Sequence, residues 1–262
     1  MDRRGFIKTA GVAAVSAAAT YWIVKAPRGG CYLQMGTSVT SGIVPKASTT
    51  PAIVGDRLGM VGVNAGLLGA CAGQNRYPHM ESRSLYCLVD AITSRSWAMQ
   101  DADVSEPATK VHFERLKAAD FATVTYLGLE YGINDFRYGR PIGSNGDSTR
   151  ETFRGGLNYS LHRLALAFPQ LRLFLITPGW CTNFEDKDSD QYPNEIGAFL
   201  REYVDAMREI GAIHHVPCLD LWRTLGVNAD NYKTLTFDGV HPTPEGARRR
   251  GEVIASFIQA TF

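Results

Sequence analysis

Three residues of this chain have the types that nucleophilic catalysis needs: Ser38, Asp238 and His241. Ser38 follows a short apolar run that ends at Gly36, whereas the other two lie near the far end of the chain. A serine hydroxyl is a weak nucleophile unless a base takes its proton and a third group orients that base. His241 can act as the base, and Asp238 can fix its tautomer. We therefore expect these residues to support attack on a carbonyl carbon.

Negative charge develops on the carbonyl oxygen during such an attack, so hydrogen-bond donors must meet it. Three donors are candidates for this oxyanion hole: the backbone N–H of Ser38, the backbone N–H of Gly69 and the side-chain amide of Asn134. Each donor at such a site typically contributes roughly 3–4 kcal/mol to transition-state stabilisation.

The elements that must position these residues are indicated by five short apolar runs, at residues 31–35, 60–63, 123–129, 171–176 and 216–219. The runs are nearly continuous rather than alternating, which is typical of parallel strands covered on both faces. Helical apolar spacing lies between them, at residues 85–92, 153–168 and 196–210. A last helix is expected to begin at Pro244 with Thr243 as its N-cap. The alternation predicts one doubly wound α/β domain.

In an open α/β sheet, ligands bind beyond the carboxyl ends of the strands. Ser38 follows the first run, Gly69 the second and Asn134 the third, while Asp238 and His241 lie between the fifth run and the last helix. We therefore expect all five residues to meet at one edge of the sheet.

Four stretches resemble, in order, the four blocks of the SGNH (GDSL-type) serine hydrolases: Gly36-Thr37-Ser38, Asn64 to Gly69, Gly132 to Asp135, and Asp238 to His241. The resemblance covers residues 31–262. It implies a flavodoxin-like three-layer α/β/α sandwich with a five-stranded parallel sheet. It also implies ester hydrolysis without a metal or other cofactor, and the roles given above to Ser38, Gly69, Asn134, Asp238 and His241.

Residues 84–92 and 131–143 look like those of an exported bacterial subgroup of this family. Tyr131 and Phe136, in the second of these stretches, are candidate substrate-binding residues. Trp180 follows the fourth run at the same edge, so it is expected to line an acyl or sugar pocket or to pack in the core.

One position departs from the family pattern. The usual Gly-Asp-Ser is Gly36-Thr37-Ser38 here. The missing carboxylate is not the acid of the triad, which lies beside the histidine. Thr37 keeps a hydroxyl that can accept a hydrogen bond from nearby backbone, so we expect a retuned loop; a weakened enzyme stays open as the alternative.

The N-terminus carries Arg3-Arg4-Gly5-Phe6-Ile7-Lys8 and then an uncharged, alanine-rich run over residues 9–24. This pattern resembles a twin-arginine export signal. We expect residues 1–28 to be such a signal or an N-terminal anchor, and residues 29–262 to form the hydrolase domain. The export machinery is then a partner, the protein is periplasmic or secreted, and it meets a membrane only if the signal is retained.

Charge and cysteines add little chemistry. The net charge is +1, but the first 28 residues hold five basic residues and one acidic residue, so the remainder carries −3. A mildly acidic body gives no basic face for nucleic acid, which we do not expect as a partner. The five cysteines are expected to be buried thiols, because their spacing matches no metal motif. Residues 248–250, three arginines, are expected on the wet face of the last helix.

We expect an esterase that removes small acyl groups, with acetyl as one candidate, from a simple ester or from an acylated periplasmic or cell-surface glycan. Two alternatives stay open. The first is a non-catalytic glycan-binding or envelope-assembly protein on a decayed hydrolase scaffold, which Thr37 motivates. The second is an acyltransferase that uses the same triad, because water and a sugar hydroxyl compete for one acyl-enzyme.

Overall fold

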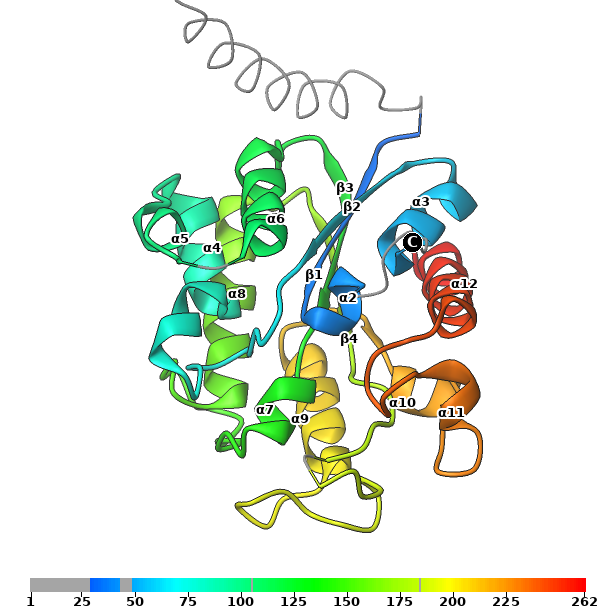
Figure 1. Cartoon of the computed structure of the whole chain (residues 1–262). Coiled ribbons are helices and arrows are strands. Elements are labelled where there is room, and N and C mark those ends of the chain that lie inside the picture. Colours follow the sequence, from blue (N-terminus) through cyan, green and yellow to red (C-terminus); the bar gives the residue numbers. More distant parts are fainter. Residues whose placement is uncertain (1–28, 43–48, 105, 184) are drawn as a thin grey trace, which may run out of the picture.

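A five-stranded, all-parallel sheet forms the centre of the molecule (Figure 1). The computed structural model describes residues 29–42, 49–104, 106–183 and 185–262; the expected export signal lies outside them. The strands are β1 (Cys31–Gly36), β2 (Val61–Gly66), β3 (Val124–Glu130), β4 (Arg172–Ile176) and β5 (Cys218–Leu219). Their order across the sheet is β2-β1-β3-β4-β5. The doubly wound sheet that the five apolar runs predict is confirmed, and so is the flavodoxin-like fold that the family resemblance implies.

Helices connect the strands on both faces of the sheet. They are α2 (Ser38–Ser41), α3 (Thr50–Leu58), the 3-10 helix η1 (Pro78–Arg83), α4 (Leu85–Ser94), α5 (Ala98–Asp101), α6 (Pro107–Ala118), α7 (Ile133–Arg137), α8 (Phe153–Ala167), α9 (Leu200–Ile213), α10 (Leu221–Thr224), α11 (Tyr232–Leu235) and α12 (Pro244–Thr261). The expected N-cap of α12 is present, because the Thr243 hydroxyl accepts a hydrogen bond from the Gly246 N–H at 3.1 Å.

Alternate residues of the strands fill two separate cores. Leu33 and Met35 of β1 pack into a cluster with α4, α6, α8 and α9, whereas Tyr32 of the same strand packs with α3 and α12. Successive side chains of a strand point to opposite faces, so both faces of β1 are covered. This is the three-layer sandwich that near-continuous apolar strands predict.

The helix expected over residues 196–210 begins later than its apolar spacing indicates. Gly197 adopts a positive φ of 81°, and α9 starts only at Leu200. Ile196 is exposed in the loop before it. The apolar spacing extends back across a turn in which Gly197 has left-handed backbone angles. Ile196, the first residue of the apolar stripe, therefore does not belong to the helix.

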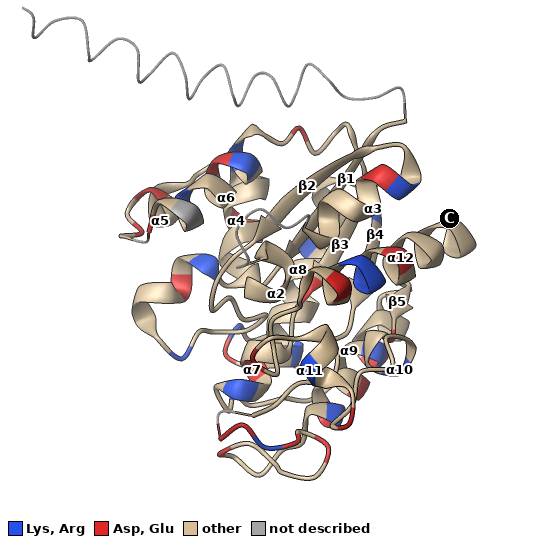
Figure 2. Cartoon of the chain, turned by 45° about the vertical axis from the view of Figure 1, so that its right-hand side comes forward, with Lys and Arg blue, Asp and Glu red and all other residues tan. Residues whose placement is uncertain are grey.

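We expected the three arginines at residues 248–250 to lie on one solvent-exposed face of α12. The structure contradicts this expectation. Arg248 is exposed and pairs with Glu245 and Glu252, whereas Arg250 is buried and forms an ion pair with Glu130 at the end of β3. Successive helix residues are about 100° apart, so residues 248–250 span about 200° of the helix surface, and Arg250 falls on its buried side. Figure 2 shows basic and acidic residues close together on α6 and α12.

The order of the strands places a topological switch beside β1. The chain leaves β1 for β2 on one side, and it later returns to β3 on the other side. In folds of this kind the crevice at the switch point binds the ligand. Within the described residues, no helix has the length and apolar character that crossing a membrane requires.

Candidate active site

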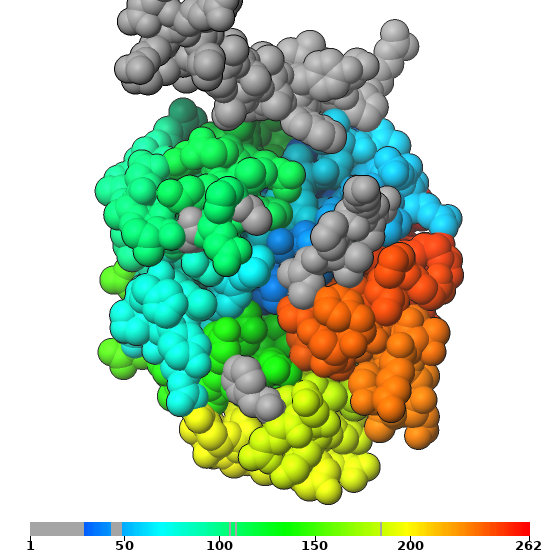
Figure 3. Space-filling model, viewed as in Figure 1, coloured from blue at the N-terminus to red at the C-terminus, as the bar shows by residue number. Residues whose placement is uncertain are grey.

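Ser38 is the first residue of α2, immediately after β1. Thr37 precedes it as the N-cap, and its hydroxyl oxygen accepts a hydrogen bond from the Val39 N–H at 3.2 Å. The expected hydroxyl contact of Thr37 is therefore present. Figure 3 shows blue spheres at the bottom of a hollow that cyan, green and orange segments border.

Ser38, His241 and Asp238 form one hydrogen-bonded chain. The Ser38 Oγ lies 2.8 Å from His241 Nε2, and His241 Nδ1 lies 2.5 Å from Asp238 Oδ2. The carboxylate accepts from Nδ1, so Nδ1 carries the proton and Nε2 is free to accept from the serine hydroxyl. The order of groups is the one that a serine nucleophile needs.

The backbone holds Asp238 in its ionised form. Burial would raise the pKa of Asp238, but its carboxylate accepts hydrogen bonds from the His241 N–H and side chain and from the Val240 N–H, and the net pKa lies below its usual value. A tight turn closes this segment, where Phe237 N–H donates to His241 O at 3.1 Å. The acid therefore stays negative beside the imidazole at neutral pH.

The candidate oxyanion donors follow β1, β2 and β3. Asn134 lies in the first turn of α7, and one of its amide protons is donated to the carbonyl oxygen of Ala70 at 2.8 Å. A carboxamide has two donor protons, so one remains for a ligand. Gly69 has a positive φ of 72°, and a Cβ built there would lie 2.7 Å from the Met80 sulfur, so the turn requires glycine.

Asp135 fixes the loop that carries Gly69, a role that sequence reasoning missed. Its fully buried carboxylate accepts from the Ala72 N–H at 3.1 Å and from the Gly73 N–H at 3.2 Å. Burial raises the pKa of Asp135 to about 6, although these backbone hydrogen bonds act against the rise. The only signal in the sequence was its place beside Asn134.

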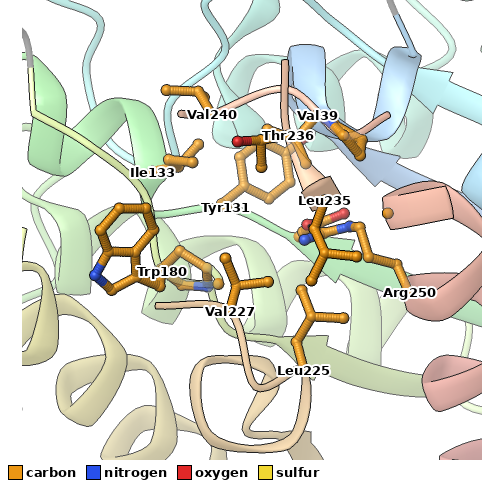
Figure 4. Close-up of a pocket in the computed structure, with 15 residues that line it drawn as sticks. Val39, Tyr131, Ile133, Trp180, Leu225, Val227, Leu235, Thr236, Val240 and Arg250 are labelled. Carbon is orange, nitrogen blue, oxygen red and sulfur yellow. The ribbon is translucent and has the colours of Figure 1, made fainter. Parts of the chain in front are cut away.

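A narrow pocket of about 20 Å³ lies next to the triad, and none of Ser38, Asp238 and His241 lines it. Val39, Ile133 and Val240, the chain neighbours of Ser38, Asn134 and His241, line one part of it (Figure 4). Leu225 and Val227 line the other side (Figure 4).

Two of the three aromatic candidates for substrate binding line this pocket. They are Tyr131 and Trp180, whose side chains are almost fully buried. Phe136 instead packs edge-on against Tyr203 with no exposed surface, so it lies in the core and not at the pocket.

Phe237 is a second residue that sequence reasoning missed. Its ring stacks on the His241 ring with centroids 5.8 Å apart, and half of its side chain is exposed. An exposed aromatic ring beside the base offers an apolar surface to a bound substrate. Its position next to Asp238 was a signal that could have identified it.

A buried polar network contacts α2, the short helix that begins at Ser38. The Glu130 carboxylate accepts from Gln34 Nε2 and from Thr40 Oγ1, each at 2.7 Å, and forms an ion pair with Arg250. Burial lowers the pKa of Arg250 to about 10, so it remains charged at neutral pH. The network ties β1, β3 and α12 to α2 through Thr40, two residues after Ser38.

The structure offers no evident place for a metal ion. Among the residues that it describes, no three His, Cys, Asp or Glu side chains gather as such an ion would require. All five cysteines, which are all described, are free thiols.

Comparison with known families identifies the class of protein. Residues 35–249 match the GDSL-like lipase/acylhydrolase family. This match spans most of the chain, so the chain belongs to that family, which is a family of hydrolases. No curated protein matches the chain by sequence.

Solved structures agree on the fold. A protein from Lactobacillus plantarum is 21% identical, with a TM-score of 0.66 over 89% of this chain and 98% of that one. A carbohydrate acetylesterase from Sinorhizobium meliloti and the M. smegmatis aryl esterase are each 15% identical, with a TM-score of 0.59 over 89% of this chain and 100% of theirs. At these identities the likeness shows the fold alone.

Proposed function

We propose that this protein is a serine esterase that hydrolyses small acyl esters at Ser38. The observation that carries the proposal is the continuous chain from Ser38 Oγ to His241 Nε2 and from His241 Nδ1 to Asp238. Membership of an acylhydrolase family supports the same reaction class.

In the first half of the reaction, Ser38 Oγ attacks the carbonyl carbon while His241 Nε2 takes the hydroxyl proton. Asp238 stabilises the imidazolium that forms. The Ser38 N–H, the Gly69 N–H and the free amide proton of Asn134 meet the oxyanion. The C–O bond to the alcohol then breaks, and His241 gives its proton to the departing oxygen.

In the second half, water attacks the acyl group on Ser38. His241 takes a proton from this water and returns it to Ser38 Oγ when the acid leaves. The same acyl-enzyme would serve an acyltransferase if a sugar hydroxyl replaced water.

An acylated glycan is the substrate class that we favour, with acetyl as a candidate acyl group. The expected export signal would bring the protein to the cell envelope, where such glycans occur. A fold neighbour, the S. meliloti protein, is named a carbohydrate acetylesterase, which is consistent with this choice. The half-exposed ring of Phe237 would suit the apolar face of a sugar.

The rival proposal is a non-catalytic binding protein on a decayed hydrolase scaffold. Its motive was Thr37 in place of the usual aspartate. The Thr37 hydroxyl caps α2, and Ser38 is within hydrogen-bond distance of His241. These contacts favour the enzyme over the rival.

The test is hydrolysis of p-nitrophenyl acetate by the full chain and by Ser38→Ala. We expect turnover by the wild type and a fall of at least about a thousandfold in the variant, because the nucleophile is lost. Equal rates in the two proteins would sink the proposal. A parallel assay of acetate release from acetylated xylan and peptidoglycan would test the glycan part separately.

A further inference from the structure

A second serine–histidine contact lies one helical turn beyond Ser38. The Ser41 Oγ of α2 lies 3.2 Å from His112 Nε2 of α6. Both side chains are buried, with 7% and 8% of their surfaces exposed. His112 Nδ1 lies against the carbonyl oxygen of Asn64 and not against a carboxylate, so the pair lacks the acid of a triad and we assign it a role in the structure of the site.

The hydrogen bonds define the tautomer of His112. Its Nδ1 lies 3.0 Å from the carbonyl oxygen of Asn64, which can only accept, so Nδ1 carries the proton. Arg115 donates to the same carbonyl at 3.2 Å. Nε2 is therefore bare and accepts from the Ser41 hydroxyl. Burial and the neighbouring Arg115 charge lower the pKa of His112 to about 4, which keeps the ring neutral.

Asn64 links this pair to both sides of the candidate oxyanion hole. Its Nδ2 donates to the Ser41 carbonyl oxygen at 2.9 Å, and its Oδ1 accepts from the Gly66 N–H at 3.0 Å. Gly66 approaches α2 so closely that a Cβ there would lie 2.4 Å from the Ser41 nitrogen. The end of β2, which leads to Gly69, is thus bound to the nucleophile helix.

The helix α2 has only one turn, so its position depends on such side-chain contacts. Two backbone hydrogen bonds close it, from Ser41 N–H to Thr37 O and from Gly42 N–H to Ser38 O. Thr40 fastens one side to Glu130 of β3, and Ser41 fastens another to α6. Removing either contact would leave Ser38 on a short helix that is held less firmly.

We propose that Ser41 and His112 are positioning residues that hold α2, and with it Ser38, at the distance from His241 and Gly69 that attack requires. This inference rests on the proposed esterase function. A misplacement of about 1 Å by a residue away from the chemistry can cost about a hundredfold in rate. The pair should therefore act on kcat and much less on KM.

The test compares four variants of the full chain with p-nitrophenyl acetate. We expect Ser41→Ala and His112→Leu to lower kcat by roughly 10-fold to 100-fold with KM nearly unchanged. His112→Gln should keep more activity than His112→Leu, because its amide oxygen can still accept from Ser41. Ser160→Ala is the matched control: Ser160 is a buried serine of α8 whose hydroxyl has no hydrogen-bond partner among the described residues.

The double variant Ser41→Ala/His112→Leu tests whether the two residues act through their shared contact or affect kcat independently of each other. We expect its kcat to equal that of His112→Leu alone, since one contact is lost in both. Thermal unfolding of every variant shows whether a loss of kcat results from an unfolded chain. If His112→Leu is unfolded at the assay temperature, the kcat of His112→Gln is compared with that of the wild type instead.

The outcomes distinguish this inference from the function on which it rests. A wild type without Ser38-dependent turnover would overturn the proposed function. An active wild type in which Ser41→Ala behaves like Ser160→Ala would overturn the inference alone. The contact itself can be tested without turnover by ¹⁵N NMR of the imidazoles at pH 7. We expect the Nδ1–H tautomer of His112 and a shift of its Nε2 signal in Ser41→Ala; an Nε2 signal that is the same in the wild type and in Ser41→Ala would refute the contact.

Discussion

At the scale of single residues, Thr37 caps the short helix that begins at Ser38. It occupies the position where the family pattern has an acid, and its hydroxyl takes over one hydrogen bond, from the Val39 N–H. The side chain is fully buried, so the contact is shielded from water. A neutral cap also adds no negative charge beside Ser38, where the oxyanion must form.

Thr37→Ala should therefore weaken both the helix and the reaction. Loss of an N-cap costs about 1 kcal/mol of stability, and we expect kcat to fall by roughly tenfold because α2 carries Ser38. Thr37→Ser is the matched control, since it keeps the hydroxyl and should keep most of the activity. Urea unfolding and p-nitrophenyl acetate kinetics measure the two effects. Equal activity of the alanine and serine variants would show that the cap does not matter.

At the scale of elements, the site is built by loops that leave neighbouring strands and are then bound to one another. The first turn of α7 is the clearest case. Asn134 donates to Ala70, and Asp135 accepts from Ala72 and Gly73, so two adjacent side chains of one loop hold the next loop. The ionised carboxylate of Asp135 makes this possible, although its burial is unfavourable.

That burial predicts a pH dependence of stability. The pKa of Asp135 is raised from 3.8 to about 6, so the folded state binds more protons than the unfolded state between these values. The contribution of Asp135 to the free energy of unfolding is fully present below pH 3.8. It falls by about 3 kcal/mol as the pH rises through 6. Urea unfolding of the wild type and of Asp135→Asn from pH 3.5 to 7.5 measures the contribution of Asp135 separately from that of the other titrating groups.

We expect the stability of the wild type, relative to Asp135→Asn, to fall over this range. A difference between the two proteins that stays constant, or that rises with pH, would contradict the assignment of the charge to Asp135. His112 titrates in the opposite sense, since its pKa is lowered to about 4, but it is present in both proteins and cancels.

The elements and the edge where they meet could be predicted from the sequence, because both depend on local patterns. Apolar runs identify the strands, and the ends of parallel strands lie together whatever the details of packing. The partners of Asp135, His112 and Arg250 could not be predicted. Each is a polar residue that becomes buried only because a distant segment supplies its hydrogen bonds, and a single sequence does not show which segment that is.

At the scale of the whole molecule, the ion pair between Glu130 and Arg250 joins the middle of the chain to its last helix. Both side chains are buried, and Glu130 also accepts from Gln34 of β1 and Thr40 of α2. The pair therefore connects the packing of α12 to the position of α2.

Removing only one charge of this pair should lower the free energy of unfolding far more than replacing both residues with neutral ones. Arg250→Met leaves Glu130 charged and buried, and we expect a loss of about 3–5 kcal/mol in the free energy of unfolding. Glu130→Gln/Arg250→Met removes both charges and should recover much of the loss, because a neutral glutamine still bonds Thr40. Arg248→Met, on the exposed side of the same helix, is the control and should cost under about 1 kcal/mol. Urea unfolding measures all three, and a double variant no more stable than Arg250→Met would contradict this account.

The central claim is that Ser38 is a nucleophile activated by His241. The most direct measurement is covalent labelling of the full chain with a fluorophosphonate, followed by mass spectrometry of the peptides. We predict one adduct per chain, on Ser38, with labelling abolished in Ser38→Ala and strongly slowed in His241→Ala. An unlabelled wild type, or an adduct on a different serine, would contradict it.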